Sequence, residues 1–142
     1  MPAEYSGAPL LKKLGAKDGQ TALLVAVPEE VDQLHQFSGW TRIKNAKTHR
    51  GISGGPYDYI HFFTNDIKAL KSALPALKRE VAQNGLIWVS WPKKSSGVAT
   101  TVGDMDVRSG AIKIGLVDIK VCAVDDVWSG LKLVIPVKDR KK

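Results

Sequence analysis

The feature that most constrains the fold is a series of nearly continuous apolar runs that are only long enough to be strands. "TALLVAV" (residues 21–27), "YDYIHFF" (residues 57–63) and "LIWVSW" (residues 86–91) are the clearest of them. Strands that are apolar on both faces are typical of parallel sheets covered by helices on each side. Segments with helical periodicity lie between these runs. The sequence therefore predicts an α/β fold around a mostly parallel sheet.

The remaining elements follow from periodicity and from start and stop residues. We expect helices at residues 9–14, 29–37, 66–85 and 103–115, and further strands at residues 40–46, 116–124 and 131–137. Arg42 and Lys44 share one face of the strand at 40–46, which places that strand at a sheet edge. Pro75 falls inside the long helix in phase with its apolar stripe, which predicts one kinked helix. The short turn predicted at residues 125–130 makes the last two strands antiparallel.

Length and charge fit one small basic domain. A chain of 142 residues can bury a core without disulfides, so we expect a single domain at residues 1–137 and a basic tail at 138–142. The net charge is +7, of which the tail supplies +3 from four bases and one acid. Such a charge suits solubility or weak contact with nucleic acid.

Cellular context follows from what the chain lacks. The single cysteine, Cys122, lies in an apolar run, where burial raises the pKa of a thiol and makes it unreactive. The apolar runs are too short to span a membrane, and no signal peptide is recognisable. We therefore expect a cytoplasmic protein without membrane contact.

Several of these segments resemble class I methyltransferases. "LLKKLGAKDGQTALLVAV" is similar to the first helix, turn and strand of that fold, and "YDYIHFF", "NGLIWVSWP" and the closing hairpin resemble its later half. The resemblance implies a six-stranded Rossmann-like sheet of order 2-1-3-4-6-5, with the last strand antiparallel and one strand–helix unit missing. It also leaves the strand at 40–46 at the edge.

The chain departs from that family where the cofactor binds. A methyltransferase follows its first strand with an acidic residue and a Gly-x-Gly turn, so that backbone approaches the methionine part of S-adenosylmethionine. This chain has "VAVPEEVD", in which Glu29 and Glu30 place carboxylates where the cofactor's own carboxylate would lie. The second strand ends in Asn45, Ala46 and Lys47, without an acid to hold a ribose. We therefore expect no cofactor, and a divergent S-adenosylmethionine-dependent transferase is only an alternative.

Longer phrases resemble an uncharacterised family of small bacterial proteins, a domain of unknown function. "YSGAPLLKKLG", "LIWVSWPKKSSGV" and "GLVDIKVCAVDDVWSGLKLV" carry this resemblance across nearly the whole chain. It implies the same truncated methyltransferase-like fold but no activity.

Two loops supply the main candidate site. In open parallel sheets ligands bind beyond the carboxyl ends of the strands, and residues 92–97 and 125–130 leave two such ends. The candidate rim comprises Lys93, Lys94, Ser95, Ser96, Gly97, Asp125, Trp128 and Ser129. Lysines and hydroxyls suit a phosphate or carboxylate, and Trp128 would provide a stacking surface. The structural alternative is that a lysine pairs with Asp125 or Asp126, the serines cap the next segment and Trp128 fills the core.

A second basic segment provides a weaker candidate. Arg42, Lys44, Lys47 and Arg50 flank a glycine-rich loop and would follow a nucleic-acid backbone, although no aromatic residues are interleaved for base stacking. We expect instead a solvated edge with a mobile loop. The three histidines fit no metal motif, and no nucleophile motif is present, so we assign neither a metal site nor catalytic residues.

These observations favour a non-catalytic or regulatory binding module. It would take an anionic small molecule or a protein partner at the candidate rim. Nucleic-acid binding and a divergent transferase are the alternatives.

Overall fold

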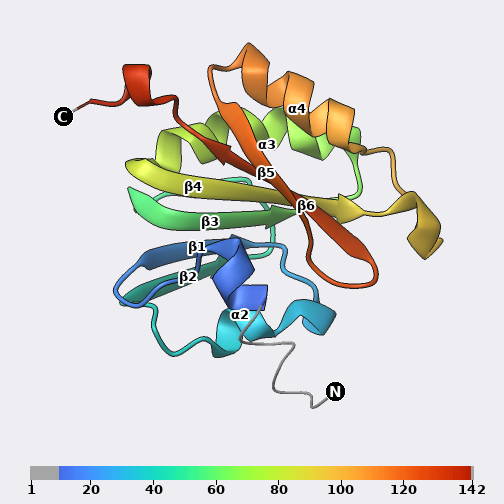
Figure 1. Cartoon of the computed structure of the whole chain (residues 1–142), viewed down its shortest axis with the longest axis horizontal. Coiled ribbons are helices and arrows are strands. Elements are labelled where there is room, and N and C mark those ends of the chain that lie inside the picture. The colour runs from blue at the N-terminus through green and yellow to red at the C-terminus, as the bar shows by residue number, and fades with distance from the viewer. Residues whose placement is uncertain (1–9, 142) are drawn as a thin grey trace.

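The computed structural model describes residues 10–141, and within them a single six-stranded sheet (Figure 1). The strands are β1 (Thr21–Val25), β2 (Arg42–Ala46), β3 (Tyr57–Phe63), β4 (Val81–Pro92), β5 (Val117–Ala123) and β6 (Trp128–Val134). Their order is β2-β1-β3-β4-β6-β5, and β6 runs antiparallel to both of its neighbours. The predicted fold class, strand order and edge position of β2 are therefore confirmed.

Helices cover both faces of the sheet. Residues 10–14 are helical, and α2 (Gln33–Gln36), α3 (Ile67–Glu80) and α4 (Asp104–Lys113) follow. Two 3₁₀ turns, η1 (Glu29–Val31) and η2 (Lys94–Ser96), lie in the connections, and η3 (Val137–Asp139) follows β6. The predicted start of the first helix at Pro9 lies outside the described residues. Among residues 10–141, no helix combines the length and apolarity that crossing a membrane requires.

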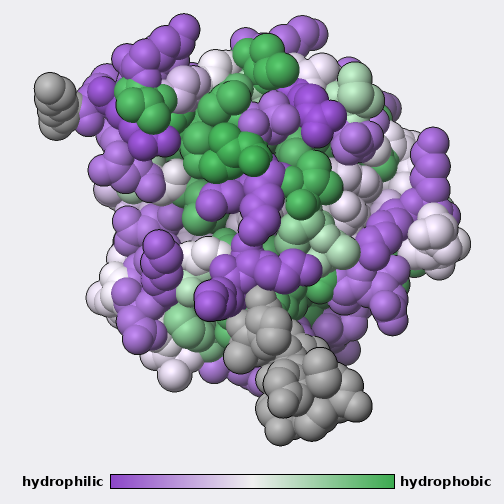
Figure 2. All heavy atoms as spheres, viewed as in Figure 1, coloured by the Kyte–Doolittle hydropathy of each residue, from purple (hydrophilic) through white to green (hydrophobic). Residues whose placement is uncertain are grey.

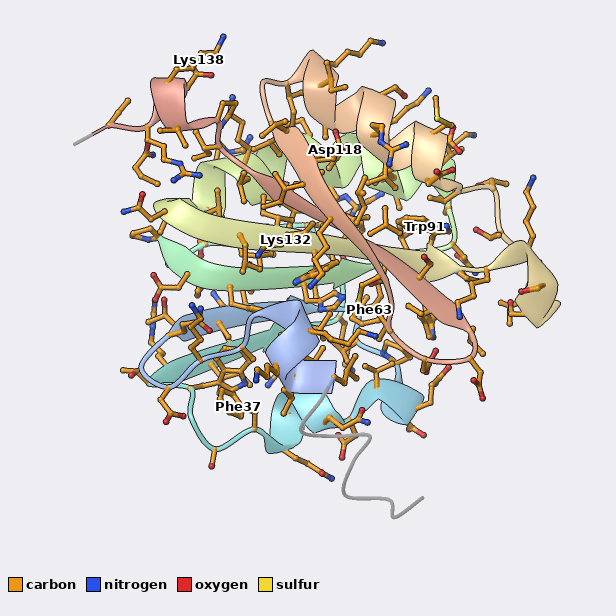
Figure 3. The ribbon with its side chains drawn as sticks, in the orientation of Figure 1. Phe37, Phe63, Trp91, Asp118, Lys132 and Lys138 are labelled. Atoms are coloured by element: carbon orange, nitrogen blue, oxygen red, sulfur yellow. The ribbon has the colours of Figure 1, made fainter. Side chains whose placement is uncertain are left out.

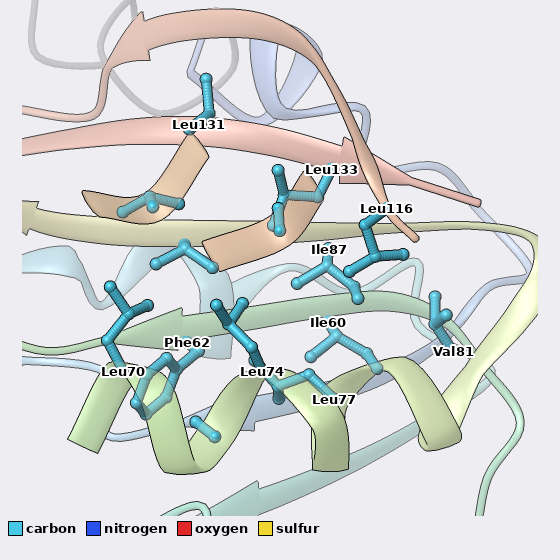
Figure 4. Close-up of a cluster of buried hydrophobic side chains, with 14 of the residues drawn as sticks. Ile60, Phe62, Leu70, Leu74, Leu77, Val81, Ile87, Leu116, Leu131 and Leu133 are labelled. Carbon is cyan, nitrogen blue, oxygen red and sulfur yellow. The ribbon is translucent and has the colours of Figure 1, made fainter. Parts of the chain in front are cut away.

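Each face of the sheet has its own hydrophobic core. Leu70, Leu74 and Leu77 of α3 pack with residues of α4 on one face, as Figure 4 shows for the α3 side. On the other face, Leu14 of the N-terminal helix and Leu34 of α2 pack against the central strands. Each large side chain buried in this way stabilises the fold by about 1.5–3 kcal/mol.

The long helix is continuous but ends earlier than predicted. Asp66 caps it by accepting a hydrogen bond from the Lys68 amide (3.3 Å), and Pro75 lies within it. The helix was expected to reach Gly85, whereas α3 ends at Glu80 and Val81 already pairs with Tyr57 in the sheet. A Cβ at Gly85 would lie 2.9 Å from the Tyr57 carbonyl oxygen. Sheet pairing at this close approach therefore overrides the helical pattern of residues 81–85.

The closing hairpin is tighter than predicted. The Asp125 carboxylate accepts hydrogen bonds from the Val127 amide (2.8 Å) and the Trp128 amide (2.7 Å), which closes the turn within three residues. Residues 128–130, predicted as turn, are therefore part of β6. The predicted end of this strand at Val137 was also wrong, because β6 ends at Val134.

Two other segments differ from expectation. The helix predicted at residues 29–37 is divided into η1 and the four-residue α2. The loop after β2 was expected to be solvated and mobile, yet the His49 ring is buried against α3, with Nε2 3.0 Å from Ser72 Oγ. That ring also meets Phe62 edge to face. The loop is therefore packed against α3.

Candidate functional site

A cavity lies at the carboxyl ends of β1 and β2, and it is called the β1–β2 cavity below. Its volume is about 420 Å³, within the range of small-molecule sites. It is lined by Leu24, Ala26, Val27, His35, Asn45, Ala46 and Lys47. The carboxyl edge of a parallel sheet is where open α/β folds bind ligands. The site is therefore in the expected place for the fold, although the sequence pointed instead to the candidate rim.

The turn after β1 gives the cavity its shape. Ala26 follows the last residue of β1 and has a φ of 58°, in the left-handed region that favours glycine. Its amide donates a hydrogen bond of 2.8 Å to the carbonyl oxygen of Ala46, which joins the ends of β1 and β2. Backbone strain of this kind, held in place by surrounding structure, is frequently found at functional sites.

Replacing Ala26 by glycine is expected to stabilise the protein by about 1 kcal/mol. Glycine adopts the left-handed conformation without the steric cost that a Cβ carries. Chemical denaturation of the wild type and Ala26→Gly measures the difference. Ala123→Gly in the exposed edge strand β5 is the matched control, and it is expected to lose about 0.5–1 kcal/mol. Equal losses in both variants would show that Ala26 carries no strain.

The charges around the β1–β2 cavity correct one sequence-based expectation. Glu29 and Glu30 were expected to place carboxylates in the cofactor position, but neither lines the cavity. Glu30 instead accepts a hydrogen bond from Trp128 Nε1, with an Oε2 distance of 3.2 Å. The ionisable side chains lining the cavity are Lys47 and His35, and the His35 ring lies 3.4 Å from the Asp32 carboxylate.

The candidate rim is partly assembled in the structure. Lys93 Nζ donates to the Asp125 carbonyl oxygen (2.8 Å), so the lysine and the hairpin turn do come together, through backbone and not through an ion pair. Ser96 Oγ donates to the Lys93 carbonyl (2.6 Å) and accepts from the Val98 amide (3.2 Å). Both bonds hold η2 closed, so Ser96 closes its own turn, whereas the structural alternative expected both serines to cap the next segment and Ser95 is exposed.

The remaining rim residues divide between solvent and the sheet. Lys94 and Ser95 of η2 and Gly97, which follows it, are exposed. Ser129 is half-buried and pairs with Trp91. Trp128 is half-buried, and its ring meets Phe63 edge to face at 5.2 Å between centroids; Phe63 is labelled in Figure 3. Trp128 therefore lies at the surface over the end of β3, where one part of its ring is packed and the other is exposed to solvent.

The basic residues of β2 are occupied within the chain. Arg42 donates to the Gly54 carbonyl (2.8 Å) and lies over the Tyr57 ring, and Lys44 donates to the Ser53 carbonyl (3.2 Å). Lys47 and Arg50 are exposed. Two of the four bases proposed for nucleic-acid contact thus hold the glycine-rich loop against the sheet edge.

A buried polar chain crosses the central strands. Tyr59 Oη lies 3.0 Å from His61 Nδ1, and His61 Nε2 lies 2.7 Å from Ser90 Oγ. All three residues have no solvent exposure, and burial lowers the pKa of His61 to about 3. A neutral imidazole that is fully buried has a structural role here. Burial likewise raises the pKa of the Cys122 thiol, the direction expected for an inert cysteine.

Comparisons with solved structures identify the fold. The chain is similar to the N-methyltransferase NodS of Bradyrhizobium japonicum, with a TM-score of 0.61 and 12% identity over 94% of this chain and 96% of that one. A SAM-dependent methyltransferase of Aquifex aeolicus gives a TM-score of 0.59 and 16% identity over 95% and 94% of the chains. The magnesium protoporphyrin IX methyltransferase of Synechocystis was solved with bound SAH. It gives a TM-score of 0.60 and 9% identity over 92% of this chain and 82% of that one.

Sequence comparisons add no relative to these structures. No family model matches the chain, and no curated protein matches it. Membership of an uncharacterised bacterial family therefore stays a prediction. At these identities the structural likeness establishes architecture alone. The chain has the Rossmann-like fold of class I S-adenosylmethionine-dependent methyltransferases.

Proposed function

We propose that this chain binds S-adenosylmethionine in the β1–β2 cavity and is a divergent transferase of that class. The observation that carries the proposal is the cavity itself, which lies at the carboxyl ends of the first two strands in a methyltransferase fold. One of the structural neighbours is a methyltransferase with bound SAH, the demethylated product. The fold and the position of the cavity favour a divergent transferase over a purely non-catalytic binding module.

The lining of the cavity fits the parts of this cofactor. Val27 offers apolar surface for the adenine ring, and the Asn45 amide can both donate to and accept from ribose hydroxyls. Lys47 would pair with the carboxylate of the methionine part. When bound, the cofactor supplies an electrophilic methyl group on its sulfonium. The left-handed turn at Ala26 takes the place of the glycine turn that the family uses.

Filling the cavity is expected to weaken cofactor binding. Asn45 is exposed on β2 and lines the cavity, so Asn45→Trp would occupy the space without disturbing the core. Isothermal titration calorimetry with S-adenosylhomocysteine should show binding to the wild type and a loss of about tenfold or more in the variant. Ile43→Trp is the control, because Ile43 is 38% exposed on the same strand but does not line the cavity.

Two results would contradict the proposal. The first is silence of the wild type at millimolar S-adenosylhomocysteine and S-adenosylmethionine. The second is equal weakening by Asn45→Trp and Ile43→Trp, which would place the ligand elsewhere or reflect damage to β2.

A second candidate function is favoured by Lys47. In doubly wound folds an acid near the end of the second strand binds the ribose 2′-hydroxyl, whereas a base nearby accommodates a 2′-phosphate. Lys47 stands at the end of β2, so a non-catalytic module for an anionic nucleotide also fits. The same calorimetry distinguishes the two by the ligand that binds, because a nucleotide module would take adenosine 2′,5′-bisphosphate and not S-adenosylhomocysteine, and Lys47→Gln would then weaken binding of the bisphosphate. Lys93→Ala and Lys94→Ala in the same assay would report on a ligand at the candidate rim.

A further inference from the structure

A second pocket lies at the opposite edge of the sheet, where β1, β3 and β4 begin, and it is called the amino-edge pocket below. Its volume is about 310 Å³. Gly15, Lys17 and Gln20 line it from the N-terminal helix and the turn before β1, and Lys132 and Val134 line it from β6. Its other lining residues are Asp58, Asn84, Gly85, Leu86, Ile119 and Arg140. Because it opens at the amino ends of the parallel strands, it is separate from the β1–β2 cavity.

Bases from three separate parts of the chain converge on this pocket. Lys17 lies in the turn before β1, Lys132 in the middle of β6, and Arg140 after η3. Lys120 of β5 stands opposite Lys132 in the antiparallel register and so lies on the same face of the sheet. Figure 3 labels Lys132 near the middle of the face that carries the N-terminal helix, and Figure 2 shows hydrophilic residues there beside the apolar residues gathered over β5.

Lys132 is held over the pocket by its neighbours. It pairs across the sheet with Trp88, whose indole is fully buried, and with Lys120 on the other side. Its Nζ would lie 3.9 Å from a Cβ placed on Gly15. The ammonium therefore extends from the sheet toward the turn that follows the N-terminal helix, instead of pointing straight into water.

Carboxylates do not neutralise these bases in the described part of the chain. Between residues 10 and 141 the ion pairs join Arg108 to Asp104 and Asp118, and His35 to Asp32. Asp58 is the one acid that lines the pocket, against three bases. Its Oδ2 already accepts hydrogen bonds from the Thr21 amide (2.9 Å) and the Thr21 hydroxyl (3.2 Å).

The clustering of these bases affects the protonation of Lys132. Burial lowers the pKa of its ammonium, and the charges of Lys120 and Lys17 lower it further. Like charges that are partly desolvated destabilise one another, and an anion placed among them relieves that repulsion. Arg140 uses Nε to donate to the Ile135 carbonyl (2.9 Å), which leaves the two terminal nitrogens of its guanidinium as further donors.

We propose that the amino-edge pocket binds a small phosphate-bearing anion through Lys17, Lys132 and Arg140. A guanidinium with two terminal donors and lysine ammonium groups is the donor set that proteins use for phosphate oxygens. The pocket volume lies at the lower end of the range for small-molecule sites, which suits inorganic phosphate, diphosphate or a small phosphorylated metabolite. The Asn84 side chain adds an amide donor to the lining.

Calorimetric titration with sodium pyrophosphate at constant ionic strength tests this site. The wild type should bind one equivalent saturably, and Lys132→Met and Arg140→Gln should each weaken binding by about tenfold or more. Lys113→Met is the matched control for Lys132→Met, because Lys113 lies on α4 at the other face of the sheet and the change in net charge is the same. The control should change affinity less than about twofold.

The affinities of the variants for pyrophosphate either support the site or exclude it. A tenfold loss confined to the pocket variants supports the site. Equal losses in Lys113→Met, or a response to sodium chloride that matches pyrophosphate, would show general charge screening and overturn it. If Lys132→Met does not fold, Arg140→Gln with the same control gives the answer.

A second readout follows the ammonium directly. In the NMR titration of Lys132, saturating pyrophosphate is expected to raise the pKa of the ammonium, since the bound anion favours its charged form. An unchanged titration of Lys132 with pyrophosphate bound would place the ligand outside the pocket.

Discussion

His61 by itself is expected to make the protein about 2 kcal/mol less stable at pH 5 than at pH 7.5. This side chain is fully buried between Tyr59 and Ser90, and burial lowers its pKa to about 3. In the unfolded chain an imidazole has a pKa of about 6.5 and takes up a proton that the folded state excludes. The stabilising effect is therefore complete above pH 6.5 and is lost as the pH falls from 6.5 toward 3. Urea denaturation across this range should show a slope of about 1.4 kcal/mol per pH unit.

The control for this prediction separates His61 from the other histidines. His61→Gln can keep hydrogen bonds to both neighbours but cannot titrate, so most of the slope between pH 6.5 and 3 should disappear. His35→Gln, at an exposed position, should retain it. Burial and Arg50 also lower the pKa of His49, which adds in the same direction. A full slope in His61→Gln would show that His61 is not the group responsible.

Trp88→Phe is expected to destabilise the protein by about 3 kcal/mol. The Trp88 ring is fully buried, and its Nε1 donates a hydrogen bond of 2.7 Å to the Leu14 carbonyl at the end of the N-terminal helix. Phenylalanine would leave that carbonyl without its partner and leave a void beside His61. Chemical denaturation at pH 7.5 measures the loss.

Trp128→Phe is the matched substitution at the candidate rim. Trp128 is half-buried, and its Nε1 bonds to the exposed Glu30, so the expected loss is below about 1 kcal/mol. A large loss at Trp128 with a small one at Trp88 would contradict the packing described here. A small loss of stability in Trp128→Phe would show that the fold does not depend on the Trp128 indole, which is then free to contact a ligand or partner.

The sheet was predictable because burial leaves a strong pattern in the sequence. Residues 21–25 and 57–63 are apolar on both faces, as central parallel strands require, and Arg42 and Lys44 mark β2 as an edge strand. The strand order came from the resemblance to methyltransferases, since periodicity does not fix which strands are neighbours. Element ends were less predictable, because Val81 fits both a helical stripe and the sheet position opposite Tyr57.

The candidate site was harder to predict because it depends on contacts distant in sequence. Lys93 was correctly expected near Asp125, but it binds the backbone carbonyl and not the carboxylate. Nothing local reveals that Ala26 is left-handed or that Glu30 is held by a tryptophan 98 residues away. The amino-edge pocket has the same origin: Lys17, Lys132 and Arg140 are far apart in the chain and meet only in the folded sheet.

Mapping S-adenosylhomocysteine onto the backbone amides by NMR tests the proposed function most directly. If the β1–β2 cavity is the binding site, the largest shifts will fall at Ala26, Val27 and residues 45–47, with little change at the amino-edge pocket. No shifts at millimolar ligand would contradict the assignment, as would shifts that cluster at residues 93–97 and 125–129 instead.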